Sequence, residues 1–212
     1  MIAICSAMKE ALIGVDIDGK KGQCNLDPSC KHSENILPKL DSLLEELGTT
    51  LADNDVYAVV VGPGSFTGIR IGISLVKGFC AGKDLPVLPL SSLGLMAYSY
   101  CKHNKPKEGF CVVMNALSGL YFFARFDKEG NMIGKEELIK AEDLGKERCE
   151  VVSLADEKLT DVSVLPTAEE LLEYAKKERK KKNFVQANQL QPIYLRKSQA
   201  EVSLEQKKVK IS

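Results

Sequence analysis

The stretch VVVGPGSFTGIRIGISLVKGFCAG, residues 59–82, decides the fold class of this chain. It begins with an apolar, β-branched run that is too short for a helix and is typical of a buried strand. A glycine-rich turn follows, and the stretch then continues as an apolar helix predicted over residues 67–81. A strand that leads through such a turn into a helix indicates an α/β protein, with helices on the faces of a mixed sheet.

The glycine-rich turn matches the known phosphate-binding loops only in part. The dinucleotide fingerprint G-x-G-x-x-G fails by one position, because the third glycine is Gly68. A P-loop requires lysine next, and here Ile69 and Arg70 follow. A helix N-terminus can still attract an anion, so anion binding stays open beside a purely conformational role for the glycines. The candidate loop residues are Gly62, Pro63, Gly64, Ser65 and Thr67.

The helix after the turn is apolar over an arc of about 220°, which is more than one sheet face can cover. It is therefore either interior or packed on both the sheet and a second protein. Gly68 and Gly72 lie four positions apart, a spacing that would let another helix approach closely. We predict a partner interface here, because exposed apolar patches mark association sites. The candidate residues on this helix are Gly68, Ile69, Gly72, Ile73 and Val76.

The rest of the chain predicts two similar halves. Short strands with an Asp18-Gly19 turn open the first half, and an amphipathic helix over residues 33–47 precedes the stretch quoted above. A strand at LPVLPL and a helix over residues 92–102 follow. The second half again opens with a strand meander, at FCVVMNA and LYFFARF, and ends in a charged helix over residues 167–182. We predict lobes at 1–104 and 105–212.

Composition excludes several classes of function. The 212 residues carry no net charge, so no global field attracts nucleic acid or an anionic membrane. The seven cysteines form no C-x-x-C pair and have no zinc spacing, and the two histidines are far apart in the sequence. We therefore predict no metal site. The absence of a membrane span or signal peptide predicts a cytoplasmic protein.

The run KKERKKK, residues 176–182, concentrates six basic side chains at the end of a predicted helix. Cations are favoured at that end by the helix dipole, so a solvated helix terminus is one interpretation. Together with the basic residues of LRKSQ and EQKKVK, the run could also contact the phosphates of a nucleic acid.

Three motifs together resemble one family. GPGSFTGIRIG after an apolar strand, the earlier HSENILPKLDSLL and the late PIYLRKS are similar to the TsaB family, also called YeaZ, in the same order along the chain. The resemblance implies an actin/Hsp70-like (ASKHA, RNase H-like) α/β fold of two related lobes, with mixed sheets flanked by helices. It also implies a role in forming N6-threonylcarbamoyladenosine at position 37 of tRNA.

The resemblance further implies that the chain is not itself an enzyme. In that family a paralogue, TsaD, carries the metal and performs the transfer, and the TsaE ATPase and a carbamoyl-adenylate synthase complete the pathway. The family's first-lobe helices bind TsaD or pair two TsaB copies, which adds Leu40 and Leu44 to the candidate interface. No cofactor is expected in this chain, ATP and metal are expected on partner subunits, and tRNA is expected to bind through the complex.

Two positions depart from the family pattern. Cys5-Ser6 stands where the family usually has Asp-Thr, and Asn115-Ala116-Leu117 replaces Asp-Ala-Arg. The departures remove an acid and a guanidinium that could hold a phosphate or its metal. The missing acid argues against one alternative, an ASKHA-type nucleotide-binding enzyme, and the lack of paired histidines argues against a second, a peptidase. A stand-alone nucleotide-binding regulator stays open as a third alternative.

Overall fold

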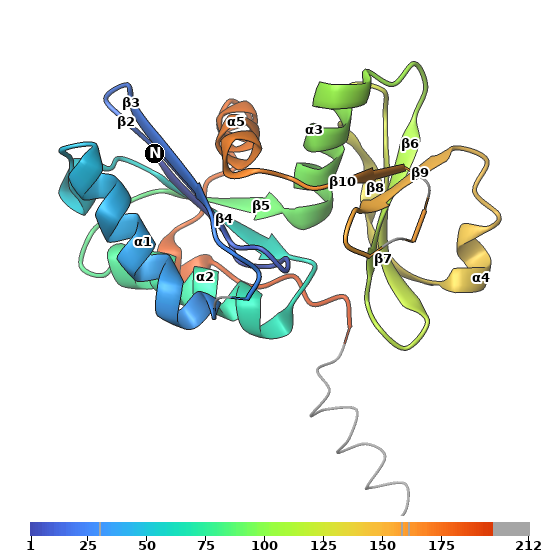
Figure 1. Cartoon of the computed structure of the whole chain (residues 1–212), viewed down its shortest axis with the longest axis horizontal. Helices are drawn as coiled ribbons and strands as arrows, with labels where there is room; N and C mark the ends of the chain where they lie inside the picture. Colours follow the sequence, from blue (N-terminus) through green and yellow to red (C-terminus); the bar gives the residue numbers. More distant parts are fainter. Residues whose placement is uncertain (30, 158, 161, 197–212) are drawn as a thin grey trace, which may run out of the picture.

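The computed structural model describes residues 1–29, 31–157, 159–160 and 162–196, and these form two five-stranded sheets (Figure 1). The first sheet has the order β3-β2-β1-β4-β5. In this sheet β1 runs antiparallel to β2 and parallel to β4. The strands are β1 (Ile2–Cys5), β2 (Leu12–Ile17), β3 (Lys20–Asn25), β4 (Tyr57–Gly62) and β5 (Val87–Ser91). Every residue of β1 and β4 is buried, so these two strands form the centre of the core.

The second sheet repeats this topology. Its order is β10-β9-β6-β7-β8, and β6 takes the place of β1, antiparallel to β7 and parallel to β9. The strands are β6 (Phe110–Asn115), β7 (Leu120–Phe126), β8 (Met132–Lys140), β9 (Glu150–Leu154) and β10 (Val162–Val164). Each sheet is thus a three-stranded meander extended by two parallel strands. The predicted α/β fold class, with two related lobes of mixed sheet flanked by helices, is confirmed.

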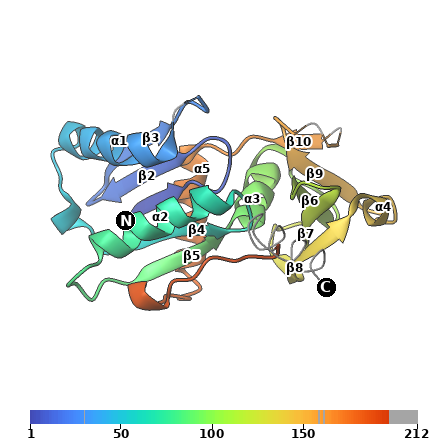
Figure 2. The same cartoon turned by 90° about the horizontal axis from the view of Figure 1, so that it is seen from below.

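Helices cover both faces of the first sheet (Figure 2). On one face lie α1 (His32–Glu46) and α2 (Phe66–Phe79), and on the other lies α5 (Ala168–Arg179). Two glycines permit this double cover. A side chain at Gly22 would meet Leu43 of α1 at 3.0 Å, and one at Gly14 would meet the Ala168 carbonyl oxygen of α5 at 3.1 Å.

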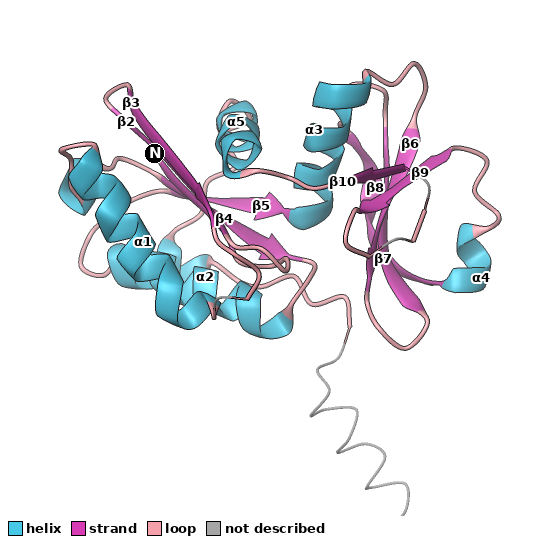
Figure 3. Ribbon diagram, in the orientation of Figure 1, coloured by secondary structure: helices cyan, strands magenta, loops and turns pink. Residues whose placement is uncertain are grey.

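The connection between the lobes is made by α3 (Ser92–Asn104), which contacts strands of both sheets. Although α5 follows the second sheet in the chain, it packs on β1, β2 and β5 of the first (Figure 3). Residues 184–193 return there as well: Val185 exchanges two backbone hydrogen bonds with Val87, at 3.0 and 2.9 Å. The strands of the first sheet precede residue 104 and those of the second sheet follow it, whereas α5, which lies in the predicted second lobe, packs on the first sheet.

Most predicted elements are present within a few residues of their expected bounds. The Asp18-Gly19 turn is confirmed, with φ of 50° and 81°. The sequence does not predict β10 or the short helix α4 (Ala141–Leu144), because segments of three and four residues carry no readable periodicity. In the described part of the chain, no helix has the length and apolar character needed to cross a membrane.

Candidate protein interface and glycine loop

The glycine loop between β4 and α2 is held against the loop that follows β1. The Ser65 amide donates to the Ala7 carbonyl oxygen at 2.8 Å. A side chain at Gly64, where φ is 155°, would stand 2.4 Å from that same oxygen. The Ser65 hydroxyl accepts a hydrogen bond from the Gly68 amide at 3.1 Å and so caps α2. Two backbone amides of this region, those of Ser65 and Gly68, therefore already donate hydrogen bonds within the chain.

Gly68 and Gly72 serve the same internal contact. A side chain at Gly68 would overlap the Ser6 carbonyl oxygen at 1.8 Å, and one at Gly72 would lie 2.6 Å from the Ser6 hydroxyl oxygen. That hydroxyl donates to the Gly68 carbonyl oxygen at 2.7 Å. The expectation that these glycines thin the helix for a partner helix is wrong: they let α2 pack onto the end of β1.

The predicted interface residues lie in the core of the first lobe. Each side chain is less than a tenth exposed, and the two glycines are also buried; the set is Leu40, Leu44, Gly68, Ile69, Gly72, Ile73 and Val76. These residues position the two helices but do not present a surface to another molecule. An interface on α1 and α2 must therefore use other side chains.

The opposite side of α2 forms an apolar groove with the start of α1. Its volume is about 650 Å³, and its lining residues are Ser33, Phe66, Thr67, Arg70, Ile71, Ser74, Leu75, Gly78 and Phe79. Leu37, one turn along α1 from Ser33, is 41% exposed. The wide apolar arc of α2 thus divides into a buried stripe and a half-buried stripe. The sequence showed the width of the arc but not which part the sheet covers.

A segment near the end of the described chain packs against Phe66 and Arg70, two residues that line this groove. The Ile193 amide donates to the Val61 carbonyl oxygen at 2.8 Å. The Tyr194 ring stacks on Phe66 with centroids 4.5 Å apart, and its hydroxyl oxygen accepts from Arg70 Nε at 2.7 Å. The Arg70 guanidinium also lies 3.9 Å from the centre of the Phe66 ring. The motif PIYLRKS is therefore in contact with the GPGSFTGIRIG motif, although residues 197 and 198 lie outside the described part.

The glycine loop also borders a cleft between the lobes. The cleft has a volume of about 420 Å³, and its lining residues are Gly64, Ser65, Phe66, Asn115, Ala116, Leu117, Phe122, Ile193, Tyr194, Leu195 and Arg196. These lining residues include no carboxylate. The single guanidinium, that of Arg196, donates to the Ala116 carbonyl oxygen and to the Ser118 hydroxyl. A ligand in this cleft would face the N-terminus of α2, but no carboxylate among the lining residues could bind a metal ion.

Cys5 and the two histidines, the side chains best suited to catalysis by their chemistry, are each buried or in contact with a neighbouring part of the chain. Cys5 is fully buried, and burial raises the pKa of its thiol to about 11. His32 Nε2 lies 3.0 Å from the Lys9 carbonyl oxygen at the start of α1. His103 Nε2 lies 2.6 Å from a Glu170 carboxylate oxygen where α3 meets α5. The two histidines thus belong to different helix contacts.

Much of the basic run at the end of α5 is paired within the chain. Lys176 forms an ion pair with Asp16. Arg179 contacts Asp55 at 2.8 Å, and Lys181 contacts Glu178 at 2.8 Å. Contact between residues 176–182 and tRNA stays a prediction, and the basic residues of EQKKVK lie outside the described part of the chain.

Comparison with known proteins gives a consistent result. The family model described as TsaD, tRNA N6-adenosine threonylcarbamoyltransferase, matches residues 27–146, which is more than half of the chain. The TsaB tRNA threonylcarbamoyladenosine biosynthesis protein of Escherichia coli is 30% identical over 80% of this chain and 83% of its own. The TsaB protein of Haemophilus influenzae is 27% identical over 92% and 93%.

A solved structure agrees with these relatives. YeaZ from Pseudomonas aeruginosa superimposes with a TM-score of 0.75 and 25% identity, over 92% of this chain and 98% of that one. The similarity therefore includes both lobes.

Proposed function

Because the chain belongs to the TsaB family of tRNA threonylcarbamoyladenosine biosynthesis proteins, we propose that it acts as the non-catalytic subunit that binds a TsaD transferase. In this proposal TsaD forms N6-threonylcarbamoyladenosine at position 37 of tRNA. The TsaE ATPase and the tRNA join through the complex, and ATP and metal are held by the partner subunits.

The apolar groove on α1 and α2 is the observation that carries this proposal. Phe66, Ile71, Leu75 and Phe79 leave apolar surface open on a helix whose other side already packs on the sheet. A partially exposed apolar patch of this kind favours association with another protein. Because TsaD and this chain match the same family model, a TsaD lobe would offer a similar pair of helices to the groove. A second copy of this chain would use the same surface, so the homodimer and the TsaD complex should compete.

The surroundings of the position where the family pattern has an acid, and of the cleft between the lobes, support a non-catalytic role. A magnesium-bound nucleotide requires carboxylate or water-mediated ligands beside its phosphates. Among the described residues that line the cleft between the lobes, none is acidic, and Cys5 is a buried thiol where the family pattern has an acid. These features count against the alternative of a nucleotide-binding enzyme or regulator. Calorimetry with ATP and magnesium tests that alternative, which predicts micromolar binding by the isolated chain.

The proposal is tested by mixing the chain with TsaD from the same cell and measuring the mass of the eluting species by size-exclusion chromatography with light scattering. We expect a complex of the two chains. The variant Leu75→Glu should elute separately from TsaD, because it places a charge in the apolar groove. The same variant should convert any homodimer to monomer.

The matched control is Ile133→Glu on β8, which introduces the same charge at an apolar side chain that is 56% exposed on the second lobe. It should form the complex normally. Circular dichroism should show both variants folded. The proposal fails if the wild-type chain and TsaD, each folded and supplied with TsaE and ATP, elute apart. If Leu75→Glu binds TsaD as well as the control does, the interface lies elsewhere.

A further inference from the structure

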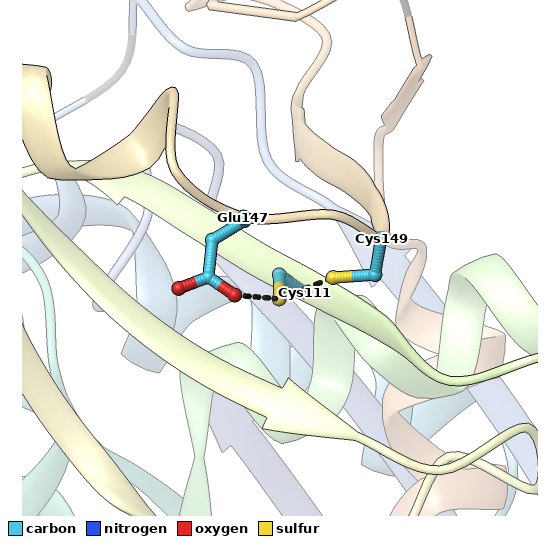
Figure 4. A group of neighbouring side chains, drawn as sticks. All are labelled: Cys111, Glu147 and Cys149. Carbon is cyan, nitrogen blue, oxygen red and sulfur yellow. Dashed lines mark hydrogen bonds between the residues drawn. The ribbon is translucent and has the colours of Figure 1, made fainter.

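Three potential metal ligands lie together on the outer side of the second sheet, next to α4 (Figure 4). Cys111 belongs to β6, whereas Glu147 and Cys149 belong to the segment that joins α4 to β9. The parallel pairing of β6 with β9 sets Cys111 opposite Val151, so that Cys149 is its diagonal neighbour. The contact is therefore fixed by the sheet and is invisible in the spacing of the cysteines along the sequence.

The ligand atoms are close enough to share one ion. The Cys111 and Cys149 sulfur atoms are 2.8 Å apart, and the Cys111 sulfur lies 3.6 Å from Glu147 Oε2. All three ligand atoms lie within 4.8 Å of one another. Cys111 is fully buried, while Cys149 and Glu147 are half-buried. The cluster thus has a closed inner side and an outer side that admits a water molecule.

The charges of the cluster match those of a divalent cation. Two thiolates and one carboxylate carry three negative charges, and Arg125 contributes one positive charge beside them. Its Nη2 atom donates to Glu147 Oε1 at 2.5 Å and its Nε atom donates to Oε2 at 3.3 Å, and Oε2 also faces Cys111. Arg125 therefore orients the carboxylate as an outer partner of the kind found around metal ligands. The net charge of the four groups, minus two, would be neutralised by one divalent ion.

We propose that Cys111, Glu147 and Cys149 bind one thiophilic divalent cation of the zinc class. Zinc bonds of about 2.3 Å to sulfur and about 2.1 Å to oxygen give an S–Zn–O angle of about 110° for the observed sulfur-to-oxygen distance, which is the tetrahedral value. The two sulfurs must separate by about 1 Å to reach the same angle. The half-buried Cys149 can make this adjustment by rotating its side chain, and water supplies the fourth ligand.

A disulfide between the two cysteines is the competing interpretation, and the surroundings favour the cation. A disulfide would leave unused the contact between Glu147 Oε2 and the Cys111 sulfur, although Glu147 would still pair with Arg125. Cys111 and Cys149 are free thiols, and their sulfur atoms, 2.8 Å apart, are farther from each other than the roughly 2.05 Å of a disulfide bond.

The test is a titration of the full chain, kept reduced by a phosphine, with Co²⁺ as the probe. We expect one equivalent to bind, with the intense visible absorption of a tetrahedral cobalt site and a sulfur-to-cobalt charge-transfer band, and we expect Zn²⁺ to displace it. Cys149→Ser should lose the charge-transfer intensity and weaken binding at least tenfold. Glu147→Gln should weaken binding while leaving the sulfur bands. Zn²⁺ should raise the unfolding temperature of the wild-type chain but not that of Cys149→Ser.

The matched control is Cys101→Ser, which removes a half-buried thiol on α3 outside the cluster. It should bind cobalt as the wild-type chain does. Unfolding without metal verifies that all variants are folded. The proposal is overturned if the reduced wild-type chain binds no cobalt, or if Cys149→Ser binds it with unchanged bands. Because the cluster lies in the second lobe, away from α1 and α2, neither result bears on TsaD binding.

Discussion

At the scale of single residues, the contact between Ser6 and α2 determines how the glycine motif is used. Gly68 and Gly72 leave room for the backbone and hydroxyl of Ser6, and the hydroxyl returns a hydrogen bond to the Gly68 carbonyl oxygen. Gly78, at the end of the same helix, has no neighbouring atom within 4 Å of where a side chain would begin. The three glycines of α2 therefore differ in what they permit.

This difference gives a prediction. Gly68→Ala should lower the free energy of unfolding by about 3 kcal/mol, because its methyl group would overlap a backbone oxygen that cannot move freely. Gly78→Ala should instead stabilise the chain by about 0.5–1 kcal/mol, through the higher helix propensity of alanine. Urea unfolding of the two variants measures both changes. Equal effects of the two substitutions would contradict this account of the helix.

The sequence predicted a close approach at Gly68 and Gly72, but the predicted neighbour was a partner helix, whereas the observed neighbour is Ser6 of the same chain. Glycines four apart on a helix allow any backbone to come near, and the partner, Ser6, lies 62 positions away in the chain. Likewise, Leu40 and Ile69 belong to apolar arcs whose buried and open parts look alike in the sequence. Only the position of the sheet separates the core residues from the groove residues Leu75 and Phe79.

At the scale of elements, α3 and α5 meet along a polar seam. Lys102 contacts the Glu173 carboxylate at 2.6 Å, and the Tyr98 hydroxyl donates to the same group at 3.1 Å. The Lys102 hydrogen bond lowers the pKa of Glu173, against the opposing effect of its partial burial. A carboxylate with a lowered pKa in the folded state stabilises the fold above its unfolded pKa, and this contribution disappears as the pH falls.

Glu173→Gln should therefore destabilise the chain at pH 7 and have no effect in acid. Both side chains are about one-third exposed, so solvent screening limits the expected loss to about 1 kcal/mol or less. The difference from the wild-type chain should close below a pH of about 4. Urea unfolding at several pH values measures it, with Glu45→Gln on the exposed side of α1 as the control. A pH-independent difference would show that the carboxylate charge is not responsible.

The elements themselves were mostly predictable, because their apolar periodicity is strong. The residues 33–47 pattern corresponds to α1, and the VYAVVVG run to β4. What the periodicity could not supply is which sheet a helix covers. The charged helix predicted over residues 167–182 packs on the first lobe, and its apolar residues, such as Leu171 and Leu172, would fit either sheet equally well.

At the scale of the whole molecule, the two lobes are joined by buried as well as exposed contacts. Ser91, at the end of β5, donates a hydrogen bond to the Glu136 carboxylate on β8 and also caps α3 by accepting from the Gly94 amide at 2.9 Å. Burial raises the pKa of Glu136, although the hydrogen bond from Ser91 lowers it in part. The ionised Glu136 carboxylate thus lowers the free energy of unfolding at the junction of the lobes.

Glu136→Gln should remove that cost while keeping an oxygen that accepts from Ser91. A carboxyl group with a raised folded-state pKa destabilises the fold at pH values above that pKa, and this penalty fades as the pH falls towards the unfolded value of about 4.3. The variant should unfold at a higher temperature than the wild-type chain at pH 7, and the gap should shrink near pH 4. Calorimetry measures both. A less stable variant at pH 7 would contradict the burial argument.

The predicted division into residues 1–104 and 105–212 can also be tested. A fragment of residues 1–104 lacks α5, so one apolar face of β1 and β2 would be exposed to water. We expect this fragment not to unfold cooperatively, and we expect a separately produced fragment of residues 105–212 to restore cooperative unfolding when the two are mixed. A stable 1–104 fragment would show that the first lobe does not depend on α5.

The position of α5 has a consequence for how the protein is made in the cell. During synthesis the ribosome releases β5 well before the helix that covers its sheet, since about 90 residues separate Val87 from the end of α5. At about 5–20 residues per second the growing chain spends roughly 4–18 s with that sheet face bare. The nascent first lobe is thus a natural client for ribosome-bound chaperones, and folding is completed only when the last helix emerges.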